Sequence, residues 1–331
     1  MHINNIYENK KILVTGGSGM IGRELVTKLL EFGARVRVAS LDDPSRVPAG
    51  CEFIKTDLTN YNSCEQACAG MDYVFHLAGI KGSPLVCKTN PVDFFDNTIL
   101  FSLNMLKAAH RGGVEKYLFT SSIGVYSPSE IFHEDDVWKT FPSDNDRFAG
   151  WAKRMGELQV EAYKIQYDWQ NIAIVRPANV YGKYDNFSPN DAMVIPSLIR
   201  RAVEGEKPLK VWGDGSPIRD FINAKDVAKG MLLVMEKMPK NPVNLGSGTG
   251  VSIKEIAEIV CKYVHGNSED IVWDTSKPSG DKKRLMDISY ARSFGFSPEI
   301  SIEDGIKEVI EWYKNNRDVA EKRYNVFRKE S

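Results

Sequence analysis

The residues near the start of the chain that are best suited to ligand chemistry are glycines in one short turn. Residues 11–22 read KILVTGGSGMIG, an apolar segment that runs through glycines into a helical pattern. A turn from strand to helix of this kind lets a pyrophosphate approach bare backbone N–H groups, where the helix dipole favours negative charge. The spacing Gly16-x-x-Gly19-x-x-Gly22 predicts a nucleotide site, although glycine turns also occur for steric reasons alone.

Strand and helix patterns alternate around this turn and predict an α/β protein. We expect strands at 11–15, 35–39, 52–56, 72–77, 116–120 and 172–175, and helices at 20–32, 61–69, 91–110 and 150–167. This rhythm predicts a Rossmann-like, doubly wound parallel sheet that is covered by helices on both faces.

The pattern becomes less regular beyond residue 182, after a polar and poorly periodic stretch at 131–147. We therefore predict that residues 1–182 form a nucleotide-binding domain and that residues 183–331 form mainly a smaller, mixed α/β substrate-binding domain. Segments near 219–246 have strand character, and either return to the first sheet or begin a second one.

Composition and charge limit the classes of function. The chain has 331 residues, of which 42% are hydrophobic and 26% charged, and its net charge is −1. These values are ordinary for a globular protein and provide no overall field for nucleic acid or an anionic membrane. No apolar run reaches the length of a membrane span and the first residues lack a signal-peptide core, so we expect a cytoplasmic protein. The five cysteines and five histidines lack metal-site spacing, and we expect no metal.

Five motifs in order resemble the extended short-chain dehydrogenase/reductase family over most of the chain. They are Thr15 to Gly22, Asp57-Leu58, His76-Leu77-Ala78-Gly79, Ser121 to Tyr126, and Arg219-Asp220-Phe221. The resemblance implies that NAD or NADP is bound by Gly16, Gly19, Met20, Ile21, Gly22, Ser40, Asp57, Leu58, Leu77, Ala78, Gly79, Lys153 and Pro177.

The second predicted strand bears on the choice between NAD and NADP. An acid at its end selects NAD, whereas a neutral residue leaves room for the 2′-phosphate of NADP. Ser40 occupies this end and favours NADP, but Asp42 or Asp43 could still reach the ribose.

The resemblance also implies the catalytic residues. In the family a Ser or Thr after the fifth strand acts with a Tyr-x-x-x-Lys, because a proton must move to or from the oxygen as hydride moves at carbon. The lysine lowers the pKa of the tyrosine and holds the cofactor ribose. Ser122 and Lys153 match this pattern, but the tyrosine position is Ala149, which has no proton to give.

We interpret Ala149 as an engineered replacement that inactivates the enzyme by removing its catalytic tyrosine. Two alternatives stay open: a natural pseudoenzyme that binds NAD(P) without catalysis, and an acid placed elsewhere. Simpler roles for the other two catalytic candidates are also possible. Lys153 could be a solvated helix residue paired with Glu157, and Ser122 could only cap the next turn.

Within the family, the C-terminal half resembles GDP-L-fucose synthase-type GDP-sugar enzymes. This resemblance implies that a nucleoside-diphosphate sugar is bound by Ser122, Asn179, Val194, Arg201, Trp212, Arg219 and Arg284. Charge-assisted hydrogen bonds from arginines suit a diphosphate in a nearly neutral protein. Residues 91–110 and 150–167 would pair with a second copy, so the resemblance also implies a homodimer.

The cysteine and histidine that epimerise C3 and C5 in fucose synthases are Gly124 and Met193 here, so we expect no such epimerisation. We interpret the chain as an oxidoreductase acting at C4 of a nucleoside-diphosphate hexose, with GDP favoured. The alternatives are a 4-epimerase that retains NAD and, from another class, a non-catalytic NAD(P)-binding pseudoenzyme. A hydrolase has little support, because no G-x-S-x-G elbow is present.

Overall fold

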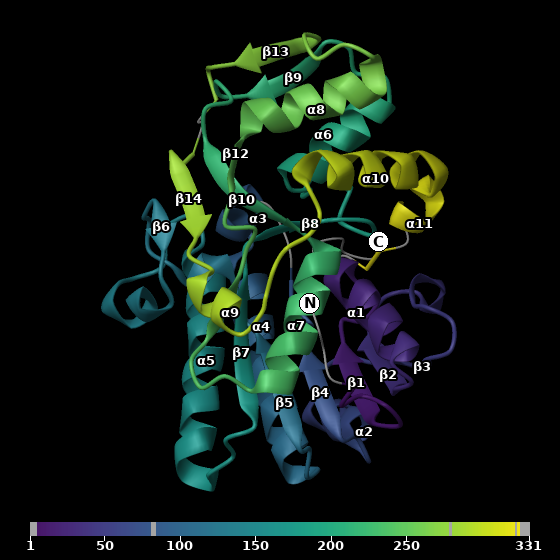
Figure 1. Ribbon diagram of the computed structural model, residues 1–331, viewed down its shortest axis with the longest axis vertical. Helices are drawn as coiled ribbons and strands as arrows, with labels where there is room; N and C mark the ends of the chain where they lie inside the picture. Colours follow the sequence, from purple (N-terminus) through teal and green to yellow (C-terminus); the bar gives the residue numbers. More distant parts are fainter. Residues whose placement is uncertain (1–4, 81–83, 278–279, 322, 325–331) are drawn as a thin grey trace.

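A seven-stranded sheet forms one end of the molecule (Figure 1). The computed structural model describes residues 5–80, 84–277, 280–321 and 323–324. The strands of the sheet are β1 (Lys11–Thr15), β2 (Arg35–Ser40), β3 (Glu52–Lys55), β4 (Tyr73–His76), β5 (Lys116–Thr120), β7 (Ile172–Pro177) and β11 (Val243–Leu245). Their spatial order is β11-β7-β5-β4-β1-β2-β3 and all neighbours are parallel. The predicted doubly wound, Rossmann-like sheet is confirmed, with its order reversing between β1 and β4.

Helices cover both faces of this sheet because its strands carry apolar side chains on both sides. In β1, Ile12 and Val14 belong to one buried core and Leu13 to the other. The first core is closed by α1 (Met20–Glu31) and α7 (Ala224–Lys237), and the second by α2 (Tyr61–Cys68), α4 (Pro91–Arg111) and α5 (Arg147–Tyr167).

A smaller α/β cap lies at the other end of the molecule and has an apolar core of its own (Figure 1). Its strands are β8 (Asn179–Tyr181), β9 (Leu209–Trp212), β10 (Ile218–Asn223), β12 (Gly250–Ser252), β13 (Ile271–Asp274) and β14 (Lys283–Met286), with β6 (Ile131–Phe132) at the sheet edge. Its helices are α6 (Val194–Val203), α8 (Ile253–His265), α10 (Ile302–Asn315) and α11 (Arg317–Glu321). The remaining described elements are the short helices α3 (Pro84–Thr89) and α9 (Ser289–Ser293) and three 3-10 helices at Pro44–Arg46, Ile123–Val125 and Glu134–Lys139.

Several elements differ from the sequence prediction. Helix α5 begins at Arg147, three residues earlier than expected, and β6 lies within the stretch expected to be irregular. Helix α7 was not predicted, because its apolar run Met231 to Met235 is buried all round and therefore hides the helical period. Of the segments near 219–246 that were expected to have strand character, β11 joins the first sheet and β10 joins the second.

Helices α4 and α5 pack against each other and expose apolar side chains, among them Leu103 (46% exposed), Leu158 (46%) and Ile165 (77%). The homodimer stays a prediction. Within the described part of the chain, no helix is long and apolar enough to cross a membrane. The same residues contain no group of three or more His, Cys, Asp or Glu side chains that could hold a metal ion.

A buried ion pair fixes α5 to the sheet. Glu157 accepts hydrogen bonds from Nε and Nη2 of Arg176 on β7, at 2.9 and 2.6 Å, and another from Ser121 Oγ after β5. Both charged side chains are almost completely buried. Although burial opposes its charge, the hydrogen bonds to Glu157 hold the pKa of Arg176 above its usual value. The pair therefore sets the position of α5 relative to the ends of β5 and β7.

We predict that Glu157→Gln lowers the free energy of unfolding by about 3 kcal/mol, because it leaves the buried guanidinium of Arg176 without a counter-charge. Urea unfolding followed by circular dichroism measures this loss. The matched control is Glu31→Gln, which breaks the exposed pair with Lys28 and should cost less than about 0.5 kcal/mol. Equal effects of the two variants would contradict the prediction.

Candidate functional site

A cleft of about 1940 Å³ runs along the carboxyl ends of the parallel strands, between the sheet and the cap. Ligands of open α/β sheets bind at this edge, where the strand order reverses. Every predicted site residue lines the cleft: Gly16, Gly19, Met20, Ile21, Gly22, Ser40, Asp57, Leu58, Leu77, Ala78, Gly79, Ser122, Ala149, Lys153, Pro177, Asn179, Val194, Arg201, Trp212, Arg219 and Arg284. One continuous space thus joins the expected cofactor and substrate residues.

The turn between β1 and α1 has the shape that a pyrophosphate requires. A Cβ at Gly22 would lie only 2.2 Å from the carbonyl oxygen of Gly16, so a side chain there cannot be accommodated. Gly19 is the N-cap of α1 and offers no side-chain hydrogen bond to the first N–H groups of the helix. These donors border the cleft and are suited to an anionic ligand, so the residues fit the cofactor.

The adjacent ends of β1 and β4 are held by the hydroxyl of Thr15. Its Oγ1 accepts hydrogen bonds from Leu77 N at 3.1 Å and Ala78 N at 3.0 Å, and lies 2.9 Å from Nδ1 of His76. With both N–H groups donating to Oγ1, the hydroxyl proton is available for His76 Nδ1. Burial lowers the pKa of His76, which therefore stays neutral and acts as this acceptor.

An acid lies at the end of the cleft that β2 borders. Asp42 lines this end, and its Oδ2 accepts a hydrogen bond from Ser18 Oγ at 2.6 Å. Its Oδ1 accepts one from the backbone N–H of Tyr324, near the C-terminus. Asp43 instead points its carboxylate at Ser45 N. The residue that supplies an acid near Ser40 is therefore Asp42.

Ser122 lies directly after β5 and combines a capping role with a free donor. Its Oγ accepts a hydrogen bond from Gly124 N at 3.1 Å, as the capping interpretation expected. This contact uses a lone pair of the oxygen and leaves the O–H proton to be donated into the cleft.

Lys153 is not a solvated lysine paired with Glu157. Its Nζ donates to Thr120 O at 2.9 Å and lies 5.2 Å from the centre of the Phe119 ring. Burial lowers the pKa of Lys153 to about 8. A Cβ at Gly79 would lie 3.9 Å from Nζ, so the ammonium group faces the cofactor side of the cleft. Ala149 lies one helical turn earlier and lines the same space.

The three predicted substrate arginines differ in how they are bound. Arg201 pairs with Glu206, and Arg284 pairs with Asp146 at 3.0 Å. Arg219 donates instead to two backbone carbonyl groups, those of Ile218 and Asp281. Arg219 therefore keeps more of its charge for an anion than the other two do.

Among the residues that line the cleft, the sequence did not single out Cys87, Asp146 or Tyr324. Asp146 lies three residues before Ala149, but its contact with Arg284 is what holds its carboxylate in the cleft. Tyr324 comes close to the site through its contact with Asp42. The sequence suggested Asp42 as a ribose ligand only because it follows the second strand. No local pattern marks such residues, so sequence reasoning could not have found them.

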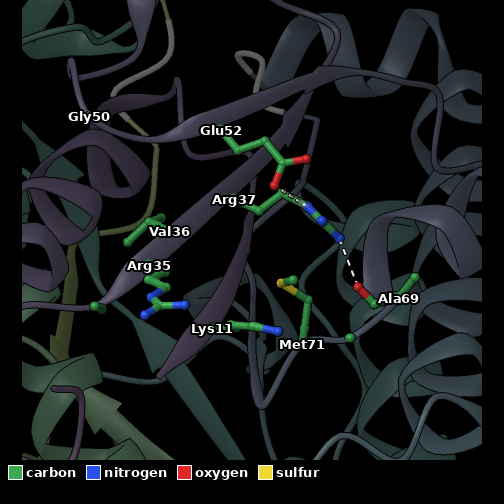
Figure 2. Close-up of a pocket in the computed structure, with 10 residues that line it drawn as sticks. Lys11, Arg35, Val36, Arg37, Gly50, Glu52, Ala69 and Met71 are labelled. Atoms are coloured by element: carbon green, nitrogen blue, oxygen red, sulfur yellow. Dashed lines mark hydrogen bonds and ion pairs between the residues drawn. The ribbon is translucent and has the colours of Figure 1, made fainter. Parts of the chain in front are cut away.

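A second, smaller hollow of about 400 Å³ lies at the amino ends of β1 and β2, at the opposite edge of the sheet (Figure 2). Figure 2 shows Arg37 between Glu52 and Ala69, and hydrogen bonds join it to both. None of the predicted site residues lines this hollow. We therefore assign the chemistry to the larger cleft.

Known proteins are similar to this chain in both sequence and fold. Residues 12–246 match the NAD dependent epimerase/dehydratase family. GDP-L-fucose synthase 1 of Arabidopsis thaliana is 33% identical over 318 residues, which cover 93% of this chain and 94% of that protein. The solved structure of the epimerase Mth375 from Methanothermobacter thermautotrophicus has a TM-score of 0.84 and 27% identity over 96% of both chains. A GDP-6-OMe-4-keto-L-xylo-heptose reductase from C. jejuni has a TM-score of 0.79 and 26% identity, over 93% of this chain and 98% of that one.

We predict that Lys153→Met stabilises the protein by about 2 kcal/mol at pH 7, because it removes a buried charge at the cost of one hydrogen bond. Lys153 has a pKa of about 8 in the folded state and the usual 10.5 when unfolded. Between these values the unfolded chain binds more protons, so the wild type gains stability as the pH rises. The advantage of the variant should therefore shrink between pH 8 and about 10.5.

Urea unfolding of both proteins from pH 7 to 10.5 measures this difference. The exposed Lys28→Met is the control and should show no such trend. A constant difference between wild type and Lys153→Met would contradict the assigned burial of the charge.

We also predict that Asp42→Asn shifts the ratio of NAD to NADP affinity toward NADP by about tenfold. Removing a negative charge near a 2′-phosphate is worth about 1.4 kcal/mol. Titration calorimetry with each cofactor measures the ratio, and Asp43→Asn is the control because that side chain faces Ser45 N. An unchanged ratio in Asp42→Asn would place the ribose elsewhere.

Proposed function

Because this chain belongs to the NAD dependent epimerase/dehydratase family, we propose that it is a nucleotide-sugar oxidoreductase. It would transfer hydride between NAD(P) and C4 of a nucleoside-diphosphate hexose, with GDP as the favoured nucleotide. The choice of GDP is supported by the two relatives that are a GDP-L-fucose synthase and a GDP-heptose reductase.

The observation that carries this proposal is the convergence of Ser122 and Lys153 between the glycine turn and the arginines of the cap. All of them line one cleft. The donors before and within α1 would hold the pyrophosphate of the cofactor, and Asp42 would face its adenosine ribose. Lys153 would hold the nicotinamide ribose, with its ammonium group beside Gly79.

The bound cofactor would supply the hydride acceptor or donor, and the chain would manage the oxygen and the anionic substrate. Ser122 would donate its O–H proton to the oxygen on C4, because Gly124 N occupies only a lone pair of the Ser122 oxygen. Arg219 would bind the diphosphate through charge-assisted hydrogen bonds. Trp212 is 59% exposed at the cleft, and its ring is available to stack on the nucleotide base.

Redox at C4 without epimerisation at C3 and C5 is supported by two positions that line the cleft. Gly124 and Met193 both lack a group that could take a proton from carbon. A 4-epimerase that retains NAD is the second candidate, favoured by the likeness to the epimerase Mth375. A non-catalytic NAD(P)-binding protein is the third, favoured by Ala149.

The test incubates the chain and its Ala149→Tyr variant, each separately, with GDP-, UDP-, CDP- and dTDP-sugars and with NAD or NADP. We predict that the sugars of one nucleotide class are converted and that those of the other classes are not. Absorbance of the reduced nicotinamide follows the redox step, and chromatography of the sugars identifies the product. The panel includes 4-keto sugars, so that both directions are covered. Ser122→Ala should lower the rate at least about 100-fold, because it removes the donor to the C4 oxygen.

Each other result selects a different function. Inversion at C4 without net change of cofactor would identify the 4-epimerase. Cofactor binding without turnover by either form, on any sugar of the panel, would contradict the oxidoreductase and favour the pseudoenzyme.

A further inference from the structure

The cleft has alanine at position 149, where the family resemblance predicts a tyrosine, but it is also lined by the carboxylate of Asp146. Asp146 is the N-cap residue of α5, yet its side chain accepts no hydrogen bond from the helix. The carboxylate lines the cleft instead, where its Oδ2 lies 3.0 Å from Nη2 of Arg284 on β14. This ion pair holds the carboxylate in the site, three residues before Ala149.

Asp146 and Ser122 border the same space beside Gly124. A Cβ at Gly124 would lie 3.5 Å from Cγ of Asp146 and 3.5 Å from Oγ of Ser122. An oxygen atom in this region comes within hydrogen-bonding reach of both groups. Because glycine has no side chain, it leaves this region open to a substrate oxygen.

Four other titratable groups of the cleft, those of Cys87, Tyr181, Tyr313 and Lys153, are less suited to exchange a proton with such an oxygen. Burial raises the pKa of Cys87 to about 12, so its thiol stays protonated at neutral pH. The hydroxyls of Tyr181 and Tyr313 point to groups of the cap, Ser301 O and a carboxylate oxygen of Glu204. The ammonium of Lys153 is engaged with Thr120 O, on the cofactor side.

The contacts of Asp146 hold its carboxylate at the cleft. The guanidinium of Arg284 is in direct contact with it, and the N-terminus of α5 adds the positive end of a helix dipole. A carboxylate held in this way can take the proton of a substrate hydroxyl. This is the task of a base in the oxidation of an alcohol.

We propose that Asp146 is the catalytic base of this site and takes the proton that a tyrosine at position 149 would otherwise take. The proposal rests on the proposed function, which supplies oxidised NAD(P) as hydride acceptor. Oxidation breaks the C4–H bond, whose electron pair leaves as hydride, and the O–H bond, whose electron pair becomes the second C–O bond. The hydroxyl proton moves to the carboxylate of Asp146 and then to solvent, since a quarter of this side chain is exposed. Reduction is the same sequence in reverse.

Four proteins test this assignment: the wild type, Asp146→Asn, Ala149→Tyr and the double variant. We expect Asp146→Asn to lower kcat at least about 100-fold, because the amide cannot take the proton. In the double variant the tyrosine provides a second route, so kcat should return to within about tenfold of that of Ala149→Tyr. A merely structural role of Asp146 predicts no such rescue.

Binding provides a readout that does not depend on turnover. Asparagine can still accept a hydrogen bond from Arg284, so the affinities of Asp146→Asn for GDP and for NAD(P), measured by calorimetry, should stay within about threefold of wild type. Asp144→Asn is the matched control, because Asp144 is exposed on the same loop and should leave kcat unchanged.

A second variant covers the case in which Asp146→Asn fails to fold. Gly124→Ala places a methyl group at ordinary contact distance, 3.4 Å from Cβ of Asp146, and so fills the space between the base and Ser122 without removing either. We expect it to lower kcat at least about tenfold while GDP affinity is retained.

Three outcomes would overturn the assignment. They are full activity of Asp146→Asn, loss of activity in the double variant, and turnover by Ala149→Tyr while the wild type is silent. In all three cases the active forms would still support the proposed oxidoreductase. Silence of all four proteins on every nucleotide sugar would instead reject the proposed function, and the role of Asp146 with it.

Discussion

The buried ion pair between Glu157 and Arg176 is the interaction on which the geometry of the site depends. Glu157 lies one helical turn after Lys153 and also accepts a hydrogen bond from Ser121, the residue before Ser122. One carboxylate therefore fixes the helix that carries Lys153 and the strand end that carries Ser122. Removing both charges from water is costly, and the cost is offset only while both partners are present. The distance between Ser122 and Lys153 is thus determined by contacts that lie behind the cleft.

The sheet and the cap, which form the two walls of the cleft, provide different kinds of binding group. The sheet provides backbone donors at the glycine turn and a rigid edge, where Thr15 holds the ends of β1 and β4 together. The cap provides side chains, and among them Arg219 is engaged by backbone carbonyl groups, whereas Arg201 and Arg284 pair with carboxylates. In a protein with a net charge of −1, such a local cluster is what attracts an anionic substrate. Asp146 and Arg284 join the two walls at the point where the cofactor and sugar would meet.

The sequence predicted the parts of this protein that depend on local patterns. Alternating strands and helices indicated the doubly wound sheet, and the glycine turn indicated a nucleotide site at its edge. The other cofactor residues came from the family resemblance, and all of them line the cleft. The pair of Asp146 with Arg284 and the contact of Asp42 with Tyr324 could not be predicted, because each joins residues more than a hundred positions apart. Helix α7 was missed for another reason: its five consecutive buried apolar residues, Met231 to Met235, leave only a narrow polar stripe to reveal the helix in the sequence.

The measurement that tests the account most directly follows a hydrogen isotope. The chain with Ala149 is incubated with a GDP-4-keto-hexose and with reduced NAD(P) that carries deuterium at both hydrogen positions of the nicotinamide C4. The product is examined by mass spectrometry and NMR. The account predicts one deuterium at C4 of the sugar, and, in a parallel reaction in heavy water, none at C3 or C5. A product without cofactor-derived deuterium, or with solvent deuterium at C3 or C5, would contradict it.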